Sequence, residues 1–339
     1  MRYRHCGRES VTPEPPCYDA PMLRTLLAVS ALLVVLMVAC SGEGGSTRPA
    51  GTATVLSSPT AAACTPAKAA APGTTSVTLT SAGVARRYLL HIPPGYDGAT
   101  AVPVVLALHP YAANAQLMLD ITRLPDMADR AGFIVVAADA TGAPQLWNIE
   151  KSSGAADDVA FLRDLIARID GDLCIDRDRT YAAGYSNGGG MALRLACEMP
   201  ERVAAVGVVA SQYVSCDGIA ALVAFHGTAD PILPFAGGPR PDAPGLNLLP
   251  VRRAVSEWAR QLGCDGLAQI TVPSSEVELS TYQRCRLGTG EALLYTVIGG
   301  GHSWPGGVPL PEFIVGKTTQ QLDATQVIWD FFAAHPHGR

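Results

Sequence analysis

The pattern of hydrophobic and polar positions predicts strands that alternate with helices over most of the chain. Residues Val102 to Leu108 form an unbroken apolar run between turn residues, which is typical of a strand buried on both faces of a sheet. Residues Asp157 to Ile169 instead carry apolar side chains at helical spacing. The same patterns predict further strands at Val77 to Thr80, Ala85 to Ile92, Phe133 to Ala137, Val203 to Ala210, Leu222 to Phe225 and Leu293 to Ile298. Further helices are predicted around Met127 to Arg130 and at Met191 to Met199, Arg252 to Leu262 and Ala324 to Ala334.

The order of these elements predicts an α/β fold. The first two strands are expected to form an antiparallel pair, and the later strands are separated by helices. This alternation is typical of a doubly wound, mostly parallel sheet with helices on both faces. We therefore expect one catalytic domain over residues 76–337.

The first 40 residues are predicted to be an export signal. The apolar stretch Leu26 to Ala39 is shorter than a membrane span and fits the core of a signal peptide. Met22 is the expected true start. The residues around Ala39 and Cys40 resemble the lipobox of bacterial lipoproteins, so Cys40 is the predicted lipidation site and membrane anchor. An ordinary secretory signal cut near Ala39 is the alternative.

Residues 41–75 are rich in Ser, Thr, Ala, Pro and Gly, and are predicted to form a disordered linker. The chain has nine cysteines, of which six follow Cys40. An even number in an exported chain favours disulfides, although six cysteines allow many pairings. We expect the pairs Cys264–Cys285, Cys197–Cys216 and Cys64–Cys174. The predicted location is extracytoplasmic, either secreted or membrane-anchored.

A Gly-x-Ser-x-Gly motif at residues 184–188 lies between a predicted strand and a predicted helix. A serine on such a turn projects its hydroxyl out of the sheet, and the helix N-terminus favours developing negative charge. Asp230 and then His302 follow downstream, each after a predicted strand. Ser, Asp, His is the chain order of α/β-hydrolases. The motif therefore predicts Ser186 as nucleophile, His302 as general base and Asp230 as the residue that orients the histidine.

Other titratable residues fit this chemistry less well. His335 and His337 follow the last helix, and His226 precedes Asp230, where it closes a strand. Asp157 and Asp158 stand at the start of a helix, where capping is the expected role.

The oxyanion hole needs two main-chain N–H groups. One is predicted from Asn187, and the other from Tyr111 in the loop after Val102 to Leu108, because Pro110 has no N–H. Tyr111 is also predicted to wall the acyl pocket. Trp304 and Trp147 are the other candidate substrate-binding residues, with core packing as the alternative for Trp147.

Composition narrows the function further. The 339 residues carry a net charge of −5 and no basic patch, which excludes a nucleic-acid partner. No cysteine or histidine spacing indicates a metal, so we expect no metal site.

With these motifs, the sequence resembles secreted esterases related to polyhydroxybutyrate depolymerases, feruloyl esterases and acetylxylan esterases. The resemblance rests on Gly-Tyr-Ser-Asn-Gly-Gly at 184–189, Phe-His-Gly-Thr-Ala-Asp at 225–230 and Gly-His-Ser-Trp-Pro-Gly-Gly at 301–307. It implies an α/β-hydrolase fold, no cofactor, and hydrolysis of esters on plant cell-wall polysaccharides or of polyesters. The sequence departs from the family at residues 109–111, where His-Pro-Tyr replaces the usual His-Gly followed by small residues.

The expected function is that of a serine carboxylic-ester hydrolase. Its expected substrates are short-chain or hydroxycinnamoyl (feruloyl or acetyl) polysaccharide esters, or polyhydroxyalkanoate-type polyesters. Asp230 lies only 44 positions after Ser186, so no lid domain is inserted there and an open site is expected. We expect a monomer. The alternatives are a peptidase of the same fold and a non-catalytic binding lipoprotein.

Overall fold

The computed structural model describes residues 62–211, 220–240, 243–286 and 290–337. The predicted export signal, the Cys40 lipidation site and the predicted disulfide partner Cys216 lie outside the described residues. None of the described helices is long and apolar enough to cross a membrane.

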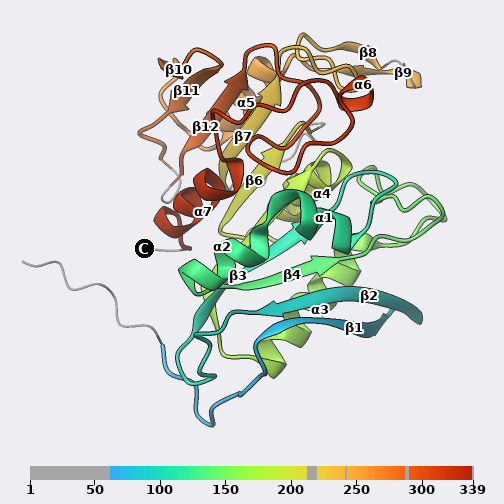
Figure 1. The fold of residues 1–339 in the computed structure, drawn as a ribbon, viewed down its shortest axis with the longest axis vertical. Coiled ribbons are helices and arrows are strands. Elements are labelled where there is room, and N and C mark those ends of the chain that lie inside the picture. Colours follow the sequence, from blue (N-terminus) through green and yellow to red (C-terminus); the bar gives the residue numbers. More distant parts are fainter. Residues whose placement is uncertain (1–61, 212–219, 241–242, 287–289, 338–339) are drawn as a thin grey trace, which may run out of the picture. The chain divides into compact units, whose positions relative to one another are not determined.

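A ten-stranded sheet organises the domain, in the order β1-β2-β4-β3-β5-β6-β7-β12-β11-β10 (Figure 1). Its strands are β1 Gly73–Ser81, β2 Val84–Ile92, β3 Val102–Leu108, β4 Ile134–Ala138, β5 Ile175–Tyr185, β6 Ala205–Val209, β7 Ala221–Gly227, β10 Gln269–Ser274, β11 Val277–Tyr282 and β12 Ala292–Val297. The middle of the sheet, from β4 to β12, is parallel, whereas both ends pair antiparallel. The predicted mostly parallel sheet is confirmed.

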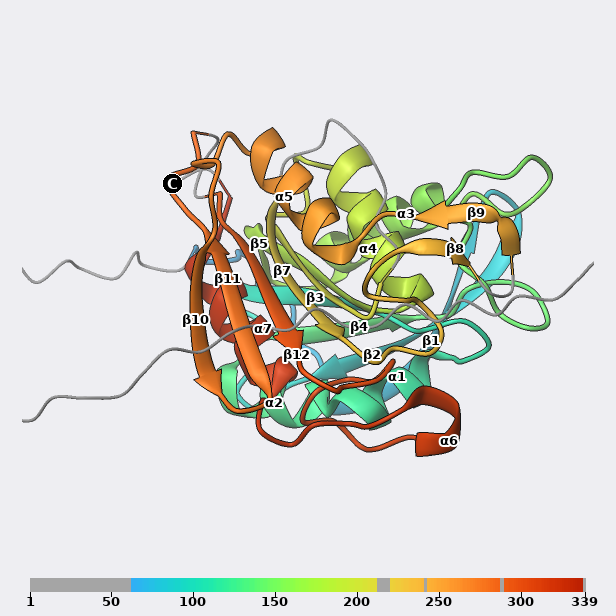
Figure 2. The same ribbon diagram turned by 90° about the horizontal axis from the view of Figure 1, so that it is seen from above.

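Helices cover both faces of this sheet, as Figure 2 shows. The helices are α1 Ala115–Thr122, α2 Leu124–Ala131, α3 Asp158–Asp172, α4 Asn187–Glu198, α5 Val251–Gln261, α6 Glu312–Val315 and α7 Ala324–Ala334. One apolar core lies between the sheet and α3, α4 and α5, and a second lies between the sheet and α1, α2 and α7. Alternate residues of β3 point into the two cores, with Leu106 in the first and Val105 in the second. Burial on both faces explains the unbroken apolar run of this strand.

Local signals start several of these helices. Asp157 accepts a hydrogen bond from the Ala160 N–H and caps α3, which confirms its predicted role. Asp158 does not cap the helix; its carboxylate instead lies 2.7 Å from the guanidinium of Arg86, and both side chains are buried. The guanidinium also lies over the ring of Phe161.

Several elements were not predicted individually. The helix α1 is short, and β10 and β11 add two antiparallel strands beyond β12. A separate two-stranded hairpin joins β8 Gly238–Arg240 to β9 Ala243–Leu248. These short elements have weak periodicity, because their strands are exposed or only partly buried.

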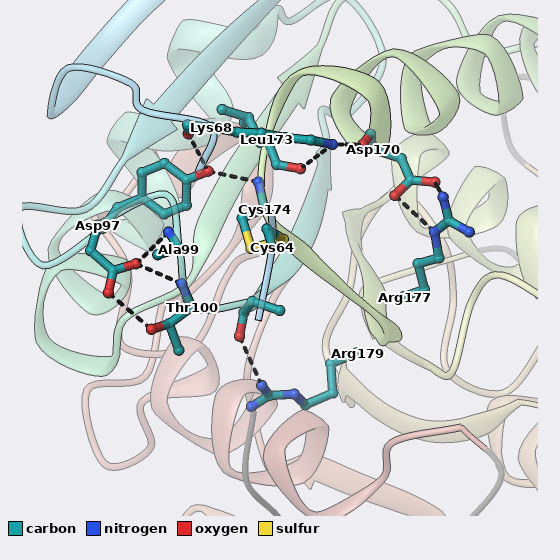
Figure 3. Close-up of a disulfide and its surroundings, with 12 residues drawn as sticks. Cys64, Lys68, Asp97, Ala99, Thr100, Asp170, Leu173, Cys174, Arg177 and Arg179 are labelled. Atoms are coloured by element: carbon teal, nitrogen blue, oxygen red, sulfur yellow. Dashed lines mark hydrogen bonds and ion pairs between the residues drawn. A yellow bond between two sulfur atoms is a disulfide. The ribbon is translucent and has the colours of Figure 1, made fainter. Parts of the chain in front are cut away.

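The predicted Cys64–Cys174 disulfide is present (Figure 3). It ties the segment before β1 to the residue that precedes β5. Close by, the ammonium group of Lys68 donates to the main-chain carbonyls of Asp170 and Leu173, at 2.7 and 3.3 Å. The segment is therefore fixed to the end of α3 as well as to β5.

These contacts correct the predicted boundary between linker and domain. The linker was predicted to extend to residue 75, but β1 already begins at Gly73. Further upstream, the N–H groups of Cys64 and Lys68 donate to the carbonyls of Ala99 and Gly98. A composition rich in small and polar residues therefore did not prevent this segment from packing, because a disulfide and main-chain hydrogen bonds hold it.

The predicted Cys264–Cys285 disulfide is also present, and it joins the end of α5 to the chain after β11. The third pair, Cys197–Cys216, stays a prediction because Cys216 is not described.

Candidate active site

The chain turns sharply at Ser186, between the end of β5 and the start of α4. Ser186 has φ 53° and ψ −117°, a backbone conformation that is strained for a residue with a side chain. Its N–H donates to the Val209 carbonyl of β6, at 2.8 Å, which holds the turn in place. A Cβ atom at Gly184 would lie 2.2 Å from the carbonyl oxygen of Gly188. The flanking glycines are therefore a steric requirement of the turn.

Ser186, His302 and Asp230 form a continuous hydrogen-bonded chain. The Ser186 Oγ lies 2.8 Å from His302 Nε2, and His302 Nδ1 lies 2.8 Å from Asp230 Oδ2. The three residues follow β5, β12 and β7, whose carboxyl ends meet on one edge of the sheet. All three side chains are buried or nearly so. The structure thus brings together three residues that span 116 positions of the chain, from Ser186 to His302.

The surroundings of Asp230 keep its carboxylate ionised. Burial by itself raises the pKa of this carboxyl, but hydrogen bonds from His226 and His302 outweigh burial and hold the pKa well below its usual range. The other oxygen, Oδ1, accepts the N–H groups of Ile232 and Leu233, at 2.8 and 2.7 Å. A fixed anion is what stabilises an imidazolium that forms on the neighbouring His302.

Tyr185 helps to hold the main chain of His302 in place. Its hydroxyl donates to the His302 carbonyl at 2.5 Å, and the two rings lie 5.5 Å apart. Burial raises the pKa of Tyr185, so the phenol stays protonated and keeps donating at alkaline pH. The His302 N–H in turn donates to the carbonyl of Val315, which ties the histidine loop to α6.

Both residues predicted to donate to the oxyanion, Asn187 and Tyr111, line the pocket beside Ser186. Among the described residues, the N–H groups of Asn187 and Tyr111 have no hydrogen-bond partner. Asn187 is the first residue of α4, where the helix leaves N–H groups unpaired. The start of α4 presses against the end of β3, since a Cβ at Gly188 would lie 2.1 Å from the Leu108 carbonyl oxygen. This close approach sets the Asn187 turn next to the Tyr111 loop.

Trp147 is not a substrate platform, contrary to one of its two predicted roles. Its side chain is buried, and its indole N–H donates to the His109 carbonyl at 3.0 Å. Its main chain is held by the side chain of Asn187, whose Oδ1 accepts the Trp147 N–H at 2.8 Å and whose Nδ2 donates to the Trp147 carbonyl at 3.2 Å. Trp147 therefore links the nucleophile turn to the loop after β3.

His109 is fixed at the centre of that loop. Its Nδ1 lies 2.7 Å from the Pro110 carbonyl, and its Nε2 accepts the Ala140 N–H at 3.0 Å. The Ala140 N–H can only donate, so Nε2 accepts and carries no hydrogen. The ring proton is therefore on Nδ1, which donates to the Pro110 carbonyl. Burial lowers the pKa of His109, which keeps this neutral form.

The prediction that Trp304 binds substrate is wrong. Its ring is 1% exposed and packs edge-on against Tyr185, and its N–H donates to the Thr325 hydroxyl at 3.0 Å. Although Trp304 is only two positions from His302, its side chain points into the core under the site. Sequence proximity to the histidine gave no information about side-chain direction.

A pocket of about 500 Å³ opens next to Ser186 and His302. Tyr111 lines this pocket and is 55% exposed. The sequence did not identify the other lining side chains, which are mostly apolar and include Leu146, Ile232, Leu233, Leu310, Ile314 and Val315. Arg240 of the β8–β9 hairpin also reaches the pocket. Within the described ranges, no group of three or more His, Cys, Asp or Glu residues could hold a metal ion.

Comparison with known proteins places the chain in a family. Residues 86–229 match the family model of the esterase PHB depolymerases. The chain is also 31% identical over 285 residues to "Putative esterase NocK" of Nocardia uniformis subsp. tsuyamanensis, an alignment that covers 76% of this chain and 82% of that protein. The chain belongs to the PHB depolymerase family of esterases. This confirms the resemblance seen in the sequence.

Two further similar proteins align with different shares of this chain and of their own length. "Feruloyl esterase B" of Piromyces equi is 29% identical over 231 residues, which is 64% of this chain but only 42% of that relative. The chain thus spans less than half the length of this relative. The solved structure of acetyl xylan esterase from Aspergillus awamori matches with a TM-score of 0.54 at 13% identity, over 77% of this chain and 99% of that one. This structural likeness confirms the predicted α/β-hydrolase fold.

Proposed function

We propose that this protein is a serine esterase in which Ser186 is the nucleophile, His302 the general base and Asp230 the residue that orients the base. The observation that carries the proposal is the buried hydrogen-bonded chain from Ser186 through His302 to Asp230, which ends at a largely apolar pocket. Membership of an esterase family supports the same chemistry.

In the first half of the reaction, His302 Nε2 takes the proton of the Ser186 hydroxyl as Oγ attacks the ester carbonyl. The imidazolium is stabilised by the Asp230 carboxylate at Nδ1. The N–H groups of Asn187 and Tyr111 donate hydrogen bonds to the carbonyl oxygen and stabilise the negative charge that forms on it. His302 then returns its proton to the leaving alcohol, and the acyl group stays on Ser186.

In the second half, water replaces the alcohol. His302 takes a proton from the water as it attacks the acyl-enzyme, and the acid leaves when Ser186 recovers its proton. The same oxyanion donors act in both halves, so their position limits both steps.

The proposed substrates are esters with a short or flat acyl group, carried on a polysaccharide or in a polyester. The apolar lining of the pocket favours an acyl group without charge, and the exposed ring of Tyr111 suits a hydroxycinnamoyl group. Relatives named as feruloyl esterases support this choice. We propose a protein that acts without a cofactor.

We further propose that the protein acts outside the cytoplasm, and that it is attached to a membrane through a lipid on Cys40. The two disulfides support an oxidising compartment. The apolar run before Cys40 supports the export signal. We expect the Cys40→Ala variant to be found free of membranes and to hydrolyse esters at the unchanged rate. If the unchanged protein is also found free of membranes, an ordinary secretory signal is favoured instead.

The test of the proposed activity is a serine probe combined with Ser186→Ala. A fluorophosphonate probe should label the unchanged protein, and Ser186→Ala should abolish labelling and lower kcat for p-nitrophenyl acetate by about 10⁴-fold or more, with the fold retained by circular dichroism. Absence of labelling in the unchanged protein would indicate a non-catalytic binding protein. Faster cleavage of matched amides than of esters would indicate a peptidase.

A further inference from the structure

A second histidine, His226, lies against the triad and has no part in the mechanism above. It is the penultimate residue of β7, four positions before Asp230, and its side chain is 1% exposed. Its Nε2 lies 2.8 Å from the Leu233 carbonyl and 3.2 Å from Asp230 Oδ2. The other ring nitrogen, Nδ1, is buried and has no hydrogen-bond partner.

This geometry fixes the ring proton of His226. A carbonyl oxygen can only accept, so Nε2 must carry the hydrogen that points at Leu233. Asp230 Oδ2 is the second acceptor of the same N–H. A proton on Nδ1 would be buried without an acceptor, which is costly. His226 is therefore a neutral ring that donates from Nε2.

The carboxylate of Asp230 is consequently surrounded by four donors. Oδ1 accepts two main-chain N–H groups, of Ile232 and Leu233, while Oδ2 accepts His302 Nδ1–H at 2.8 Å and shares the His226 Nε2–H. The oxygen that faces the catalytic base is thus the one that His226 also reaches. Leu233 takes part twice, because its N–H holds Oδ1 and its carbonyl holds the His226 ring.

Building on the proposed triad, we propose that His226 is a positioning residue of the reaction. It holds Asp230 Oδ2 toward His302 and partly offsets the negative charge on that oxygen. The carboxylate cannot rotate away from His302 without breaking bonds to the main chain and to His226. Because the His226 N–H also interacts with Oδ2, the attraction between Asp230 and a protonated His302 is weaker than it would be if His302 were the sole histidine beside this oxygen.

Among the described residues, Asp230 is the titratable group that contacts His226. His302 contacts Asp230 in turn, and Tyr185 lies beside His302. The ring of Phe235 packs edge-on against His226 from the chain that follows. On the neighbouring strand β12 the residue in register is the uncharged Thr296. A change in the pH dependence of a His226 variant can therefore be assigned to the Asp230–His302 pair.

The test compares His226→Leu, which removes the donor, with His226→Gln, whose amide nitrogen lies the same number of bonds from Cβ as Nε2. His226→Leu should lower kcat about tenfold, the effect of one lost hydrogen bond to a charged group, with a much smaller change in KM. It should also move the acid limb of the kcat/KM profile to higher pH. His226→Gln should restore most of kcat and the position of the limb.

His91 is a matched control, because it is another buried histidine whose Nε2 lies 2.9 Å from a carboxylate, that of Asp129. It belongs to β2, which four strands of the sheet separate from β7. His91→Leu should cost stability but leave the acid limb in place. If His226→Leu folds and shows the unchanged limb while Ser186→Ala is inactive, His226 only holds its loop and the inference is overturned. If Ser186→Ala keeps full activity, the proposed triad itself is wrong and this role falls with it.

A second measurement covers a His226→Leu variant that does not fold. In the unchanged protein, the proton on His226 Nε2 should be visible by NMR as a slowly exchanging, downfield signal, because it is buried and hydrogen-bonded. Formation of a phosphonate adduct at Ser186, which leaves His302 protonated, should shift this signal through the shared Oδ2. A signal that does not move on adduct formation would contradict the role.

Discussion

The residues that perform the proposed chemistry and the residues that enclose the pocket differ in how the fold holds them. Ser186, Asp230 and His302 are at most 9% exposed, lie at the ends of buried strands and are hydrogen-bonded to fixed partners. Of the pocket wall, Tyr111 and Ile314 are 55% and 53% exposed and lie outside the sheet. The contrast indicates that catalytic rate and acyl selectivity are held by separate parts of the molecule.

The wall of the pocket comes from several segments that are far apart in sequence. Tyr111 follows β3, Leu146 follows β4, Ile232 and Leu233 follow β7, Arg240 belongs to the β8–β9 hairpin, and Leu310 and Ile314 lie before and in α6. Although no lid domain is inserted between Ser186 and Asp230, the segment around α6 closes one side of the pocket. It is tied to the triad where the His302 N–H donates to the Val315 carbonyl. Changes in the wall should therefore alter selectivity more than rate.

The largest effect should come from the buried side of this comparison. Asp230→Asn keeps the shape of the side chain but removes the charge that stabilises protonated His302. We expect kcat for p-nitrophenyl butyrate to fall about 10⁴-fold, with KM nearly unchanged. A folded Asp230→Asn enzyme with more than a tenth of the original kcat would show that the carboxylate is not needed.

Asp230 also links stability to acid pH. Its pKa is lower in the folded state than in the unfolded chain, so its contribution to stability is present above the unfolded value and is lost as pH falls toward the folded value. Between about pH 5 and pH 2, the free energy of unfolding should therefore decline more steeply in the unchanged protein than in Asp230→Asn. Urea titrations at several pH values measure this slope. Parallel slopes would contradict the lowered pKa.

The sequence pattern pointed to the three buried residues that the structure brings together, but not to most of the exposed pocket wall. Ser186 lies in a motif whose glycines are required by the turn, and Asp230 and His302 each follow a strand, so local pattern located all three. Leu146 and Ile314 lie in loops whose path no periodicity specifies. Their approach to the pocket depends on tertiary packing alone.

Trp304 and Trp147 show the same limit for aromatic residues. Trp304 stands next to the histidine motif, but the direction of its ring is set by packing against Tyr185 and Thr325. Trp147 meets the side chain of Asn187, 40 positions later in the chain. Neither contact leaves a pattern in the sequence, so the sequence does not show that Trp147 links the turn at Ser186 to the loop after β3.

The next largest effect tests this link between the two oxyanion donors. Asn187→Ala keeps the main-chain donor but removes both side-chain hydrogen bonds to Trp147. We expect kcat to fall about tenfold to a hundredfold, less than the loss of a whole oxyanion donor, because the donor is displaced rather than deleted. The affinity for a boronic-acid transition-state analogue should fall by the same factor, while KM changes little.

Asn148→Ala is the matched control for this prediction. Asn148 is adjacent to Trp147 and its side chain also bonds main-chain groups, but those belong to Ser152 and Ala156 rather than to the nucleophile turn. It should leave boronate affinity unchanged. Equal losses in both variants would mean that Asn187 acts only through general loop stability.

A smaller effect, on selectivity, should come from the exposed wall. Tyr111→Ala keeps the main-chain N–H and removes a ring that Pro110, with its fixed φ, helps to hold. The unchanged enzyme should prefer p-nitrophenyl butyrate to the palmitate ester, since each added methylene needs further apolar surface worth about 0.8 kcal/mol. Tyr111→Ala should lower kcat/KM for butyrate several-fold and narrow this preference. Phe313→Ala, which removes an exposed α6 ring that does not line the pocket, should change neither. A preference for palmitate in the unchanged enzyme would show that this wall does not limit chain length.

The smallest effect on catalysis should come from the disulfides, which lie in other parts of the chain. Cys64–Cys174 closes a loop of 110 positions and Cys264–Cys285 one of 21. On the chain-entropy model, the double replacement Cys64→Ala and Cys174→Ala should cost roughly 4 to 5 kcal/mol of stability, against about 3 kcal/mol for Cys264→Ala and Cys285→Ala. Because neither pair touches the triad or the pocket wall, kcat and KM at a temperature where each variant is folded should match the unchanged enzyme. Urea unfolding and initial rates on the same samples measure both quantities. A fall in kcat without a loss of stability would show that the buried site depends on these distant links, and the separation between fold and catalysis argued above would not hold.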